Sequence, residues 1–99
     1  MTVALMWEAR AVEGQGAQLL EWARRQAQMQ TEALREPADG AGGPGPLRRE
    51  FLRAPQDRVL VLTWWDASYG ADLPELPEPD AGLITRPVHR WRFESVGVE

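Results

Sequence analysis

Cysteine and lysine are both absent from this chain of 99 residues, and His89 is its one histidine. The lack of cysteine excludes disulfide bridges, thiolate nucleophiles and thiolate-bound metals. A metal site also needs several ligands at a suitable spacing, and the sequence offers no such grouping of His, Asp and Glu. We therefore expect no metal and no bound cofactor.

Long apolar runs are missing as well. A bilayer-spanning helix needs roughly 20 apolar residues in a row, and no segment approaches this length. The first residues carry no basic group, and Glu8 interrupts their apolar run, which is not the pattern of a signal peptide. The net charge of −4 argues against non-specific binding to nucleic acid. We expect a cytoplasmic protein with no membrane and no nucleic-acid partner.

The most informative segment that is present runs over residues 58–65. In a strand, alternate residues point to opposite faces. Here both faces are apolar: Val59, Val61 and Trp65 would lie on one, and Leu60, Leu62 and Trp64 on the other. Such a strand needs cover on both sides, and a chain this short has little material with which to provide it.

Regular elements are predicted on both sides of this strand. An alternating pattern predicts a strand over residues 2–11, and a stripe containing Leu19, Ala23 and Ala27 predicts a helix over 16–35 that Pro37 ends. Residues 36–46 are rich in Gly and Pro and are expected to form a flexible loop, of which residues 38–45 are expected to be dispensable. The remaining predictions are a strand at 47–54, a turn at 54–57, a proline-rich stretch at 67–87 with at most a short helix near 68–73, and a strand at 88–98.

This order predicts one α+β domain over residues 1–99 with a ferredoxin-like β-α-β-β-(loop or short helix)-β antiparallel sheet. In that topology the helices cover one face of the sheet only. A second copy of the chain is the natural cover for the other face, so we expect a homodimer that forms through the sheet.

Part of the chain resembles the antibiotic biosynthesis monooxygenase-like group of dimeric α/β barrels. The matching residues are Pro44-Gly45-Pro46-Leu47 before the second strand, Pro55-Gln56-Asp57 at the hairpin turn, the aliphatic run Val59–Leu62, and Trp65-Asp66 at the strand end. The resemblance implies a dimeric barrel. In catalytic members it also implies cofactor-free oxygenation of aromatic, polyketide-like substrates, whereas some relatives degrade haem and others have no known activity.

The chain departs from the group's pattern at two places. Thr63 stands where members commonly carry an acidic residue, and residues 71–79 hold prolines where members usually have a helix ending near a histidine. The resemblance therefore leaves two alternatives open: oxidation of an aromatic small molecule, or a non-catalytic binding or accessory role on the same fold.

Aromatic and basic side chains supply the candidate site residues. Trp64, Trp65, Trp91 and Phe93 would suit a pocket for a planar aromatic ligand, or would fill the core and the dimer seam. Tyr69 could donate a hydrogen bond to a bound carbonyl or be an exposed loop residue. His89 could act as a general base or a haem ligand, or be a structural residue. Arginines on two strands could hold an anionic substrate or pair with nearby carboxylates; they are Arg49, Arg53, Arg90 and Arg92.

Overall fold

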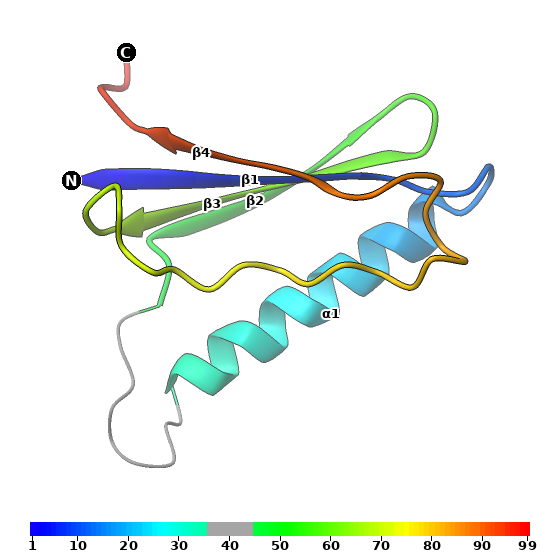
Figure 1. Ribbon diagram of the computed structural model, residues 1–99, viewed down its shortest axis with the longest axis horizontal. Coiled ribbons are helices and arrows are strands. Elements are labelled where there is room, and N and C mark those ends of the chain that lie inside the picture. The colour runs from blue at the N-terminus through cyan, green and yellow to red at the C-terminus, as the bar shows by residue number, and fades with distance from the viewer. Residues whose placement is uncertain (36–44) are drawn as a thin grey trace.

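The protein is described by a computed structural model over residues 1–35 and 45–99. One helix and four strands occur in this part of the chain (Figure 1). They are β1 (Thr2–Arg10), α1 (Gly16–Arg35), β2 (Arg48–Ala54), β3 (Arg58–Asp66) and β4 (His89–Glu94). The predicted flexible loop over 36–46 lies mostly outside the described residues, because 36–44 are not described.

The four strands form a single antiparallel sheet in the order β2-β3-β1-β4. This is the ferredoxin-like order that the sequence predicts, with β1 and β3 in the centre and β2 and β4 at the edges. The predicted α+β class is confirmed. The predicted hairpin of β2 and β3 is also present, with Ala54 opposite Arg58 next to the turn.

Helix α1 covers one face of the sheet through a stripe of small and aliphatic residues. Leu19, Ala23 and Ala27 are buried on this stripe, and they pack with Val59 and Val61 of β3. The alanines allow the helix backbone to approach the sheet closely. Two tryptophans extend the contact: the rings of Trp7 and Trp22 stack with their centroids 6.0 Å apart.

The hairpin turn holds the start of α1 in place. The Asp57 carboxylate accepts hydrogen bonds from the backbone N–H of Gly14 at 3.0 Å and of Gly16 at 3.2 Å. These bonds satisfy amides at a helix start that would otherwise lack partners. Gln56 and Asp57 both have positive φ values, 67° and 58°, which a proline-led turn alone does not predict.

The segment between β3 and β4 crosses the sheet on the same side as α1 (Figure 1). It contains no helix, and the short helix considered near residues 68–73 is instead a turn closed by the Ala71 N–H and the Ser68 carbonyl at 3.0 Å. Leu76 is buried against the core, and the Trp7 indole N–H donates to the Pro77 carbonyl at 3.2 Å. An extended proline-rich strap thus takes the place of a second helix.

The last strand is shorter than predicted. It ends at Glu94 rather than near residue 98, because β1 is its one strand partner and β1 begins at Thr2. The Ser95 N–H still donates to the Thr2 carbonyl at 2.8 Å. Beyond this point Val96 and Val98 are exposed.

Candidate functional site

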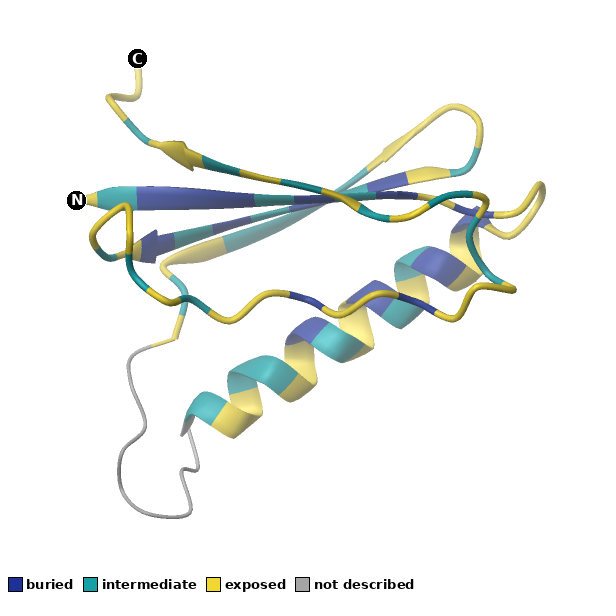
Figure 2. Ribbon diagram, in the orientation of Figure 1, coloured by how far each residue is buried: buried dark blue, intermediate teal, exposed yellow. Residues whose placement is uncertain are grey.

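The face of the sheet opposite α1 and the strap is not covered by any described residue (Figures 1 and 2). We call this surface the open face. The register places its side chains in three rows that run across β2, β3, β1 and β4. The rows are Arg48, Trp64, Ala4 and Phe93; Glu50, Leu62, Met6 and Trp91; and Leu52, Leu60, Glu8 and His89.

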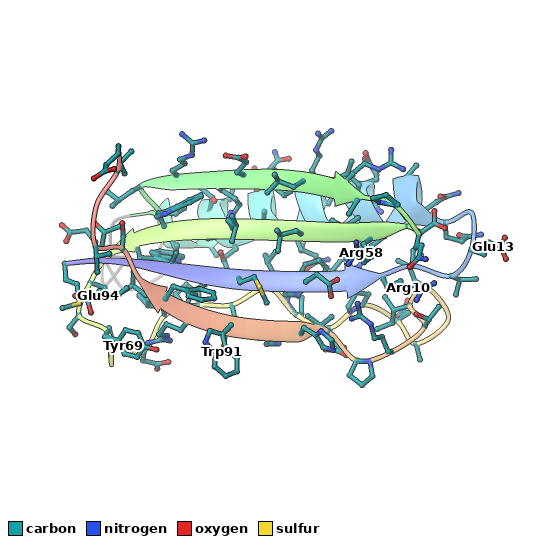
Figure 3. All side chains as sticks on the ribbon, turned by 90° about the horizontal axis from the view of Figure 1, so that it is seen from above. Arg10, Glu13, Arg58, Tyr69, Trp91 and Glu94 are labelled. Carbon is teal, nitrogen blue, oxygen red and sulfur yellow. The ribbon has the colours of Figure 1, made fainter. Side chains whose placement is uncertain are left out.

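Most of this surface is apolar. Eight of the twelve side chains in the rows are apolar, and they form a continuous band across all four strands. Trp91 is 66% exposed and Phe93 is 48% exposed (Figure 3 labels Trp91). An open groove of about 560 Å³ runs along β4, with Met6, Trp91 and Phe93 in its lining. Large exposed apolar patches mark interaction sites.

Charged groups lie at two opposite corners of the open face. At the β4 corner, the Glu8 carboxylate forms a salt bridge with Arg86 Nη2 at 2.8 Å and lies 3.7 Å from His89 Nδ1. At the β2 edge, Arg48 pairs with Glu50, and its guanidinium carbon lies 5.5 Å from the ring centroid of Trp64. The apolar band therefore runs between two compact ion pairs.

The other candidate region is the interior between the sheet and α1. Arg49 points into it from β2, where its Nε donates to Thr63 Oγ1 at 3.1 Å and its Nη1 donates to the Ala27 carbonyl at 3.0 Å. Gln30 and Thr31 supply further acceptors. Burial lowers the pKa of Arg49 below its ordinary value, because desolvation disfavours the charged form. No described carboxylate pairs with this guanidinium.

Two spaces adjoin Arg49. The enclosed cavity on the strap side measures about 10 Å³, and its lining includes Trp7, Thr63 and Leu76. A single water molecule needs about that much room. A planar aromatic molecule therefore does not fit in this cavity unless the strap moves away from the sheet. An open groove of about 280 Å³ between α1 and β2, lined in part by Thr31, also reaches Arg49.

The predicted aromatic cluster is divided between the two faces. Trp64, Trp91 and Phe93 share the open face. Trp65 lies on the opposite face, is 4% exposed, and packs with Val3 and Leu5. Because neighbouring residues of a strand point in opposite directions, Trp64 and Trp65 cannot line one pocket.

The other predicted site residues are occupied by structural contacts. The Tyr69 hydroxyl donates to the Arg92 carbonyl at 3.1 Å, and Arg92 Nη1 donates to the Ala71 carbonyl at 2.8 Å. Arg90 Nη2 lies 3.6 Å from the Glu78 carboxylate. These side chains tie the strap to β4, whereas His89 stands at the edge of the open face and Arg53 is exposed near Gly16.

Sequence reasoning missed Glu8, Arg86, Gln30 and Asp57 as residues of structural consequence. The sequence could have identified Glu8, since it is an acidic residue in an otherwise apolar central strand. Arg86 carried none, because its partner lies 78 residues away in the chain.

No group of three or more His, Asp or Glu residues that could hold a metal ion occurs within residues 1–35 and 45–99. In the same ranges, no helix has the length and apolar character needed to cross a membrane.

No protein-family model matches the chain, and no curated protein matches it. Among solved structures, it is similar to a Chloroflexus aurantiacus J-10-fl protein provisionally assigned as an antibiotic biosynthesis monooxygenase. The two share 16% sequence identity with a TM-score of 0.54, over 100% of this chain and 97% of the other. The chain has the fold of an antibiotic biosynthesis monooxygenase-like protein. The resemblance in the β2–β3 region therefore predicted the fold correctly.

Proposed function

We propose that this protein is a cytoplasmic homodimer that packs through its open face and serves as a small-molecule-binding or accessory protein on a monooxygenase-like fold. The observation that carries this proposal is the contrast between the two sides of the sheet. One side presents an uncovered apolar band, and the other is filled by α1 and the strap.

The energetics of the open face support the dimer. Trp64, Leu62 and Met6 lie in the middle of the sheet, where a second protein surface would remove them from water. Burying apolar area contributes roughly 25 cal/mol per Å², and two such faces supply a large, continuous contact. The charged corners provide the polar rim that interfaces usually have.

The small enclosed cavity weighs against oxygenation, which needs a substrate shielded from water. Ligand pockets for molecules of drug size usually have volumes of about 300–1,000 Å³, far above the enclosed cavity of about 10 Å³ beside Arg49. A bound small molecule would instead occupy an open groove, such as the one of about 280 Å³ between α1 and β2. Thr63 and His89 also do not supply an internal acid or base, because Thr63 is not ionisable and His89 lies outside the interior.

Arg49 supports a second candidate function, the cofactor-free oxidation of an aromatic small molecule. Its partly buried guanidinium is held by neutral acceptors, so a phenolate or enolate could supply the missing negative charge. Such a substrate would itself provide the electrons that reduce oxygen. It would reach Arg49 through the open groove between α1 and β2 or, from the other side, after the strap around Leu76 moves away.

Binding and oxygen uptake can be measured on the same samples. We would titrate a panel of planar phenols and quinones against tryptophan fluorescence and record oxygen consumption for each compound. The proposal predicts saturable quenching by some compounds without oxygen uptake. Oxygen uptake with product formation, lost in Arg49→Gln and kept in the matched variant Arg53→Gln, would establish the oxidase alternative instead.

A further inference from the structure

The open groove between α1 and β2 combines two arginines with an aromatic ring, and it lies on the α1 side of the sheet, away from the proposed dimer contact. We infer that this groove binds an aromatic carboxylate, a small planar anion of one or two rings. The inference rests on the small-molecule-binding role proposed above, and it names the ligand class and the site. The residues that line the groove are Arg24, Ala27, Gln28, Thr31, Arg49 and Phe51.

The charged side chains that line this groove are all basic. Arg24 reaches the groove from α1 and Arg49 reaches it from β2, and the lining contains no carboxylate. In the part of the chain that the structure describes, no carboxylate forms an ion pair with either guanidinium. Glu32 is exposed on α1, and its carboxylate accepts a hydrogen bond from Gln28 Nε2 at 3.1 Å. An anion in the groove would therefore meet positive charge that the described residues do not neutralise.

Arg49 is held in place by neutral acceptors and keeps one donor. Its Nε donates to Thr63 Oγ1 at 3.1 Å, and its Nη2 donates to Gln30 Oε1. Its Nη1 donates to the Ala27 carbonyl at 3.0 Å and to Thr31 Oγ1 at 3.3 Å. A guanidinium carries five N–H groups, so one N–H of Nη2 has no partner among the described residues. A carboxylate that reaches Nη2 would form a charge-assisted hydrogen bond and compensate the partly buried charge.

Phe51 supplies the aromatic part of the site. It lies two residues from Arg49 on the same face of β2, and the guanidinium carbon of Arg24 lies 5.7 Å from its ring centroid. This cation–π contact places the Arg24 guanidinium beside the ring. A ligand ring can pack against Phe51 and Ala27 while its carboxylate faces the two guanidiniums. The groove volume of about 280 Å³ is just below the range of about 300–1,000 Å³ for drug-sized ligands, which favours one or two rings.

An aromatic carboxylate uses both features of the groove, whereas simpler ligands use only one. Inorganic phosphate would meet the arginines but leave the Phe51 ring without a partner. A neutral aromatic amide would pack on the ring but leave the positive charge uncompensated. A nucleic acid is disfavoured because the whole chain carries a net charge of −4 and would repel a polyanion.

Heteronuclear NMR titration of the full chain can measure the affinity and locate the bound ligand. The probes are naphthoate, its neutral isostere naphthamide, and inorganic phosphate. Arg24→Gln removes one cation of the groove, and Arg25→Gln is the matched control, because Arg25 is exposed on α1 and lies outside the lining. Arg24 is a better target than Arg49, since Arg49 also ties β2 to α1 through the Ala27 carbonyl.

The inference predicts saturable binding of naphthoate, with shifts at the amides of groove residues such as Ala27, Thr31 and Phe51. It predicts that naphthamide and phosphate bind about tenfold more weakly, and that Arg24→Gln binds naphthoate about fivefold more weakly than Arg25→Gln. Naphthoate binding with shifts around Trp91 instead, or with equal affinity in the two variants, would overturn the inference and leave the proposed small-molecule-binding role standing. Binding of none of the three probes would overturn it too, and the panel of phenols and quinones would then test the binding role separately.

Discussion

At the scale of single residues, Asp57 links two parts of the chain that are distant in sequence. It sits in the β2–β3 turn and holds the amides that precede and begin α1. An ordinary hairpin signal, Pro55 followed by polar residues, predicts the turn but not this contact. This contact forms only when the folded sheet brings the turn beside Gly14 and Gly16.

Removing the Asp57 carboxylate should therefore destabilise the protein. We expect Asp57→Ala to lower the free energy of unfolding by about 1–2 kcal/mol, as the loss of a helix-capping side chain typically does. Asp57→Asn should lose less, because Asn also accepts hydrogen bonds and tolerates a positive φ. Urea unfolding would measure both, and Asp72→Ala at an exposed position serves as the control. Equal stability of Asp57→Ala and the control would show that the Asp57 hydrogen bonds to Gly14 and Gly16 do not stabilise the fold.

Gly16 is the other half of this contact. A Cβ atom at this position would lie 2.8 Å from Asp57 Oδ1. We expect Gly16→Ala to destabilise the fold by about 1–3 kcal/mol, the usual cost of overpacking, although alanine is the better helix former. Gly70→Ala is the matched control, because open space surrounds Gly70. If Gly16→Ala instead raised the melting temperature, the Asp57 side chain would have to move away from the new Cβ atom at little cost.

Trp91 and His89 share the open face but differ in apolar area. We expect Trp91→Ala to cost more stability than His89→Ala. Since Trp91 is 66% exposed in the single chain, the loss should appear mainly as weaker dimerisation. Melting temperatures measured over a range of protein concentrations would show it. A larger loss for His89→Ala would assign His89 a role that its exposed position does not indicate.

At the scale of elements, the helix and the strands follow from patterns in the sequence. The stripe of Leu19, Ala23 and Ala27 and the stop at Pro37 define α1, and the apolar alternation of residues 58–65 defines β3. The strap could not be predicted in this detail. Its prolines exclude a long helix, but its path depends on Trp7, Arg90 and Arg92, which contact it from elsewhere in the chain.

The strap should loosen when its ties to β4 are cut. We expect Arg92→Ala to speed hydrogen exchange in residues 67–76 while leaving α1 protected, because Arg92 holds the carbonyls of Tyr69 and Ala71. Hydrogen-exchange mass spectrometry would resolve the two regions. Arg58→Ala, at the start of β3 beside the hairpin turn, is the control. Unchanged exchange in the strap would mean that Leu76 and Pro77 hold it alone.

At the scale of the whole molecule, the sequence indicates which faces of the sheet need cover better than it predicts the chemistry. Apolar residues on both faces of β3 indicate that each face needs cover, and one helix can cover only one. The candidate site was harder to predict, because Trp64 and Trp65 are adjacent in the sequence yet lie on opposite sides of the sheet. The filled interior depends on how the strap packs, which no local pattern encodes.

The central claim is that a second copy of the chain covers the open face. Sedimentation equilibrium at micromolar concentration tests it most directly, with Leu62→Glu in the centre of the face and Met29→Glu on the exposed side of α1 as its control. The account predicts about twice the chain mass of 11.1 kDa for the unmodified protein and for Met29→Glu, and a monomer for Leu62→Glu. A stable monomer of the unmodified protein, or a Leu62→Glu variant that remains dimeric, would contradict it.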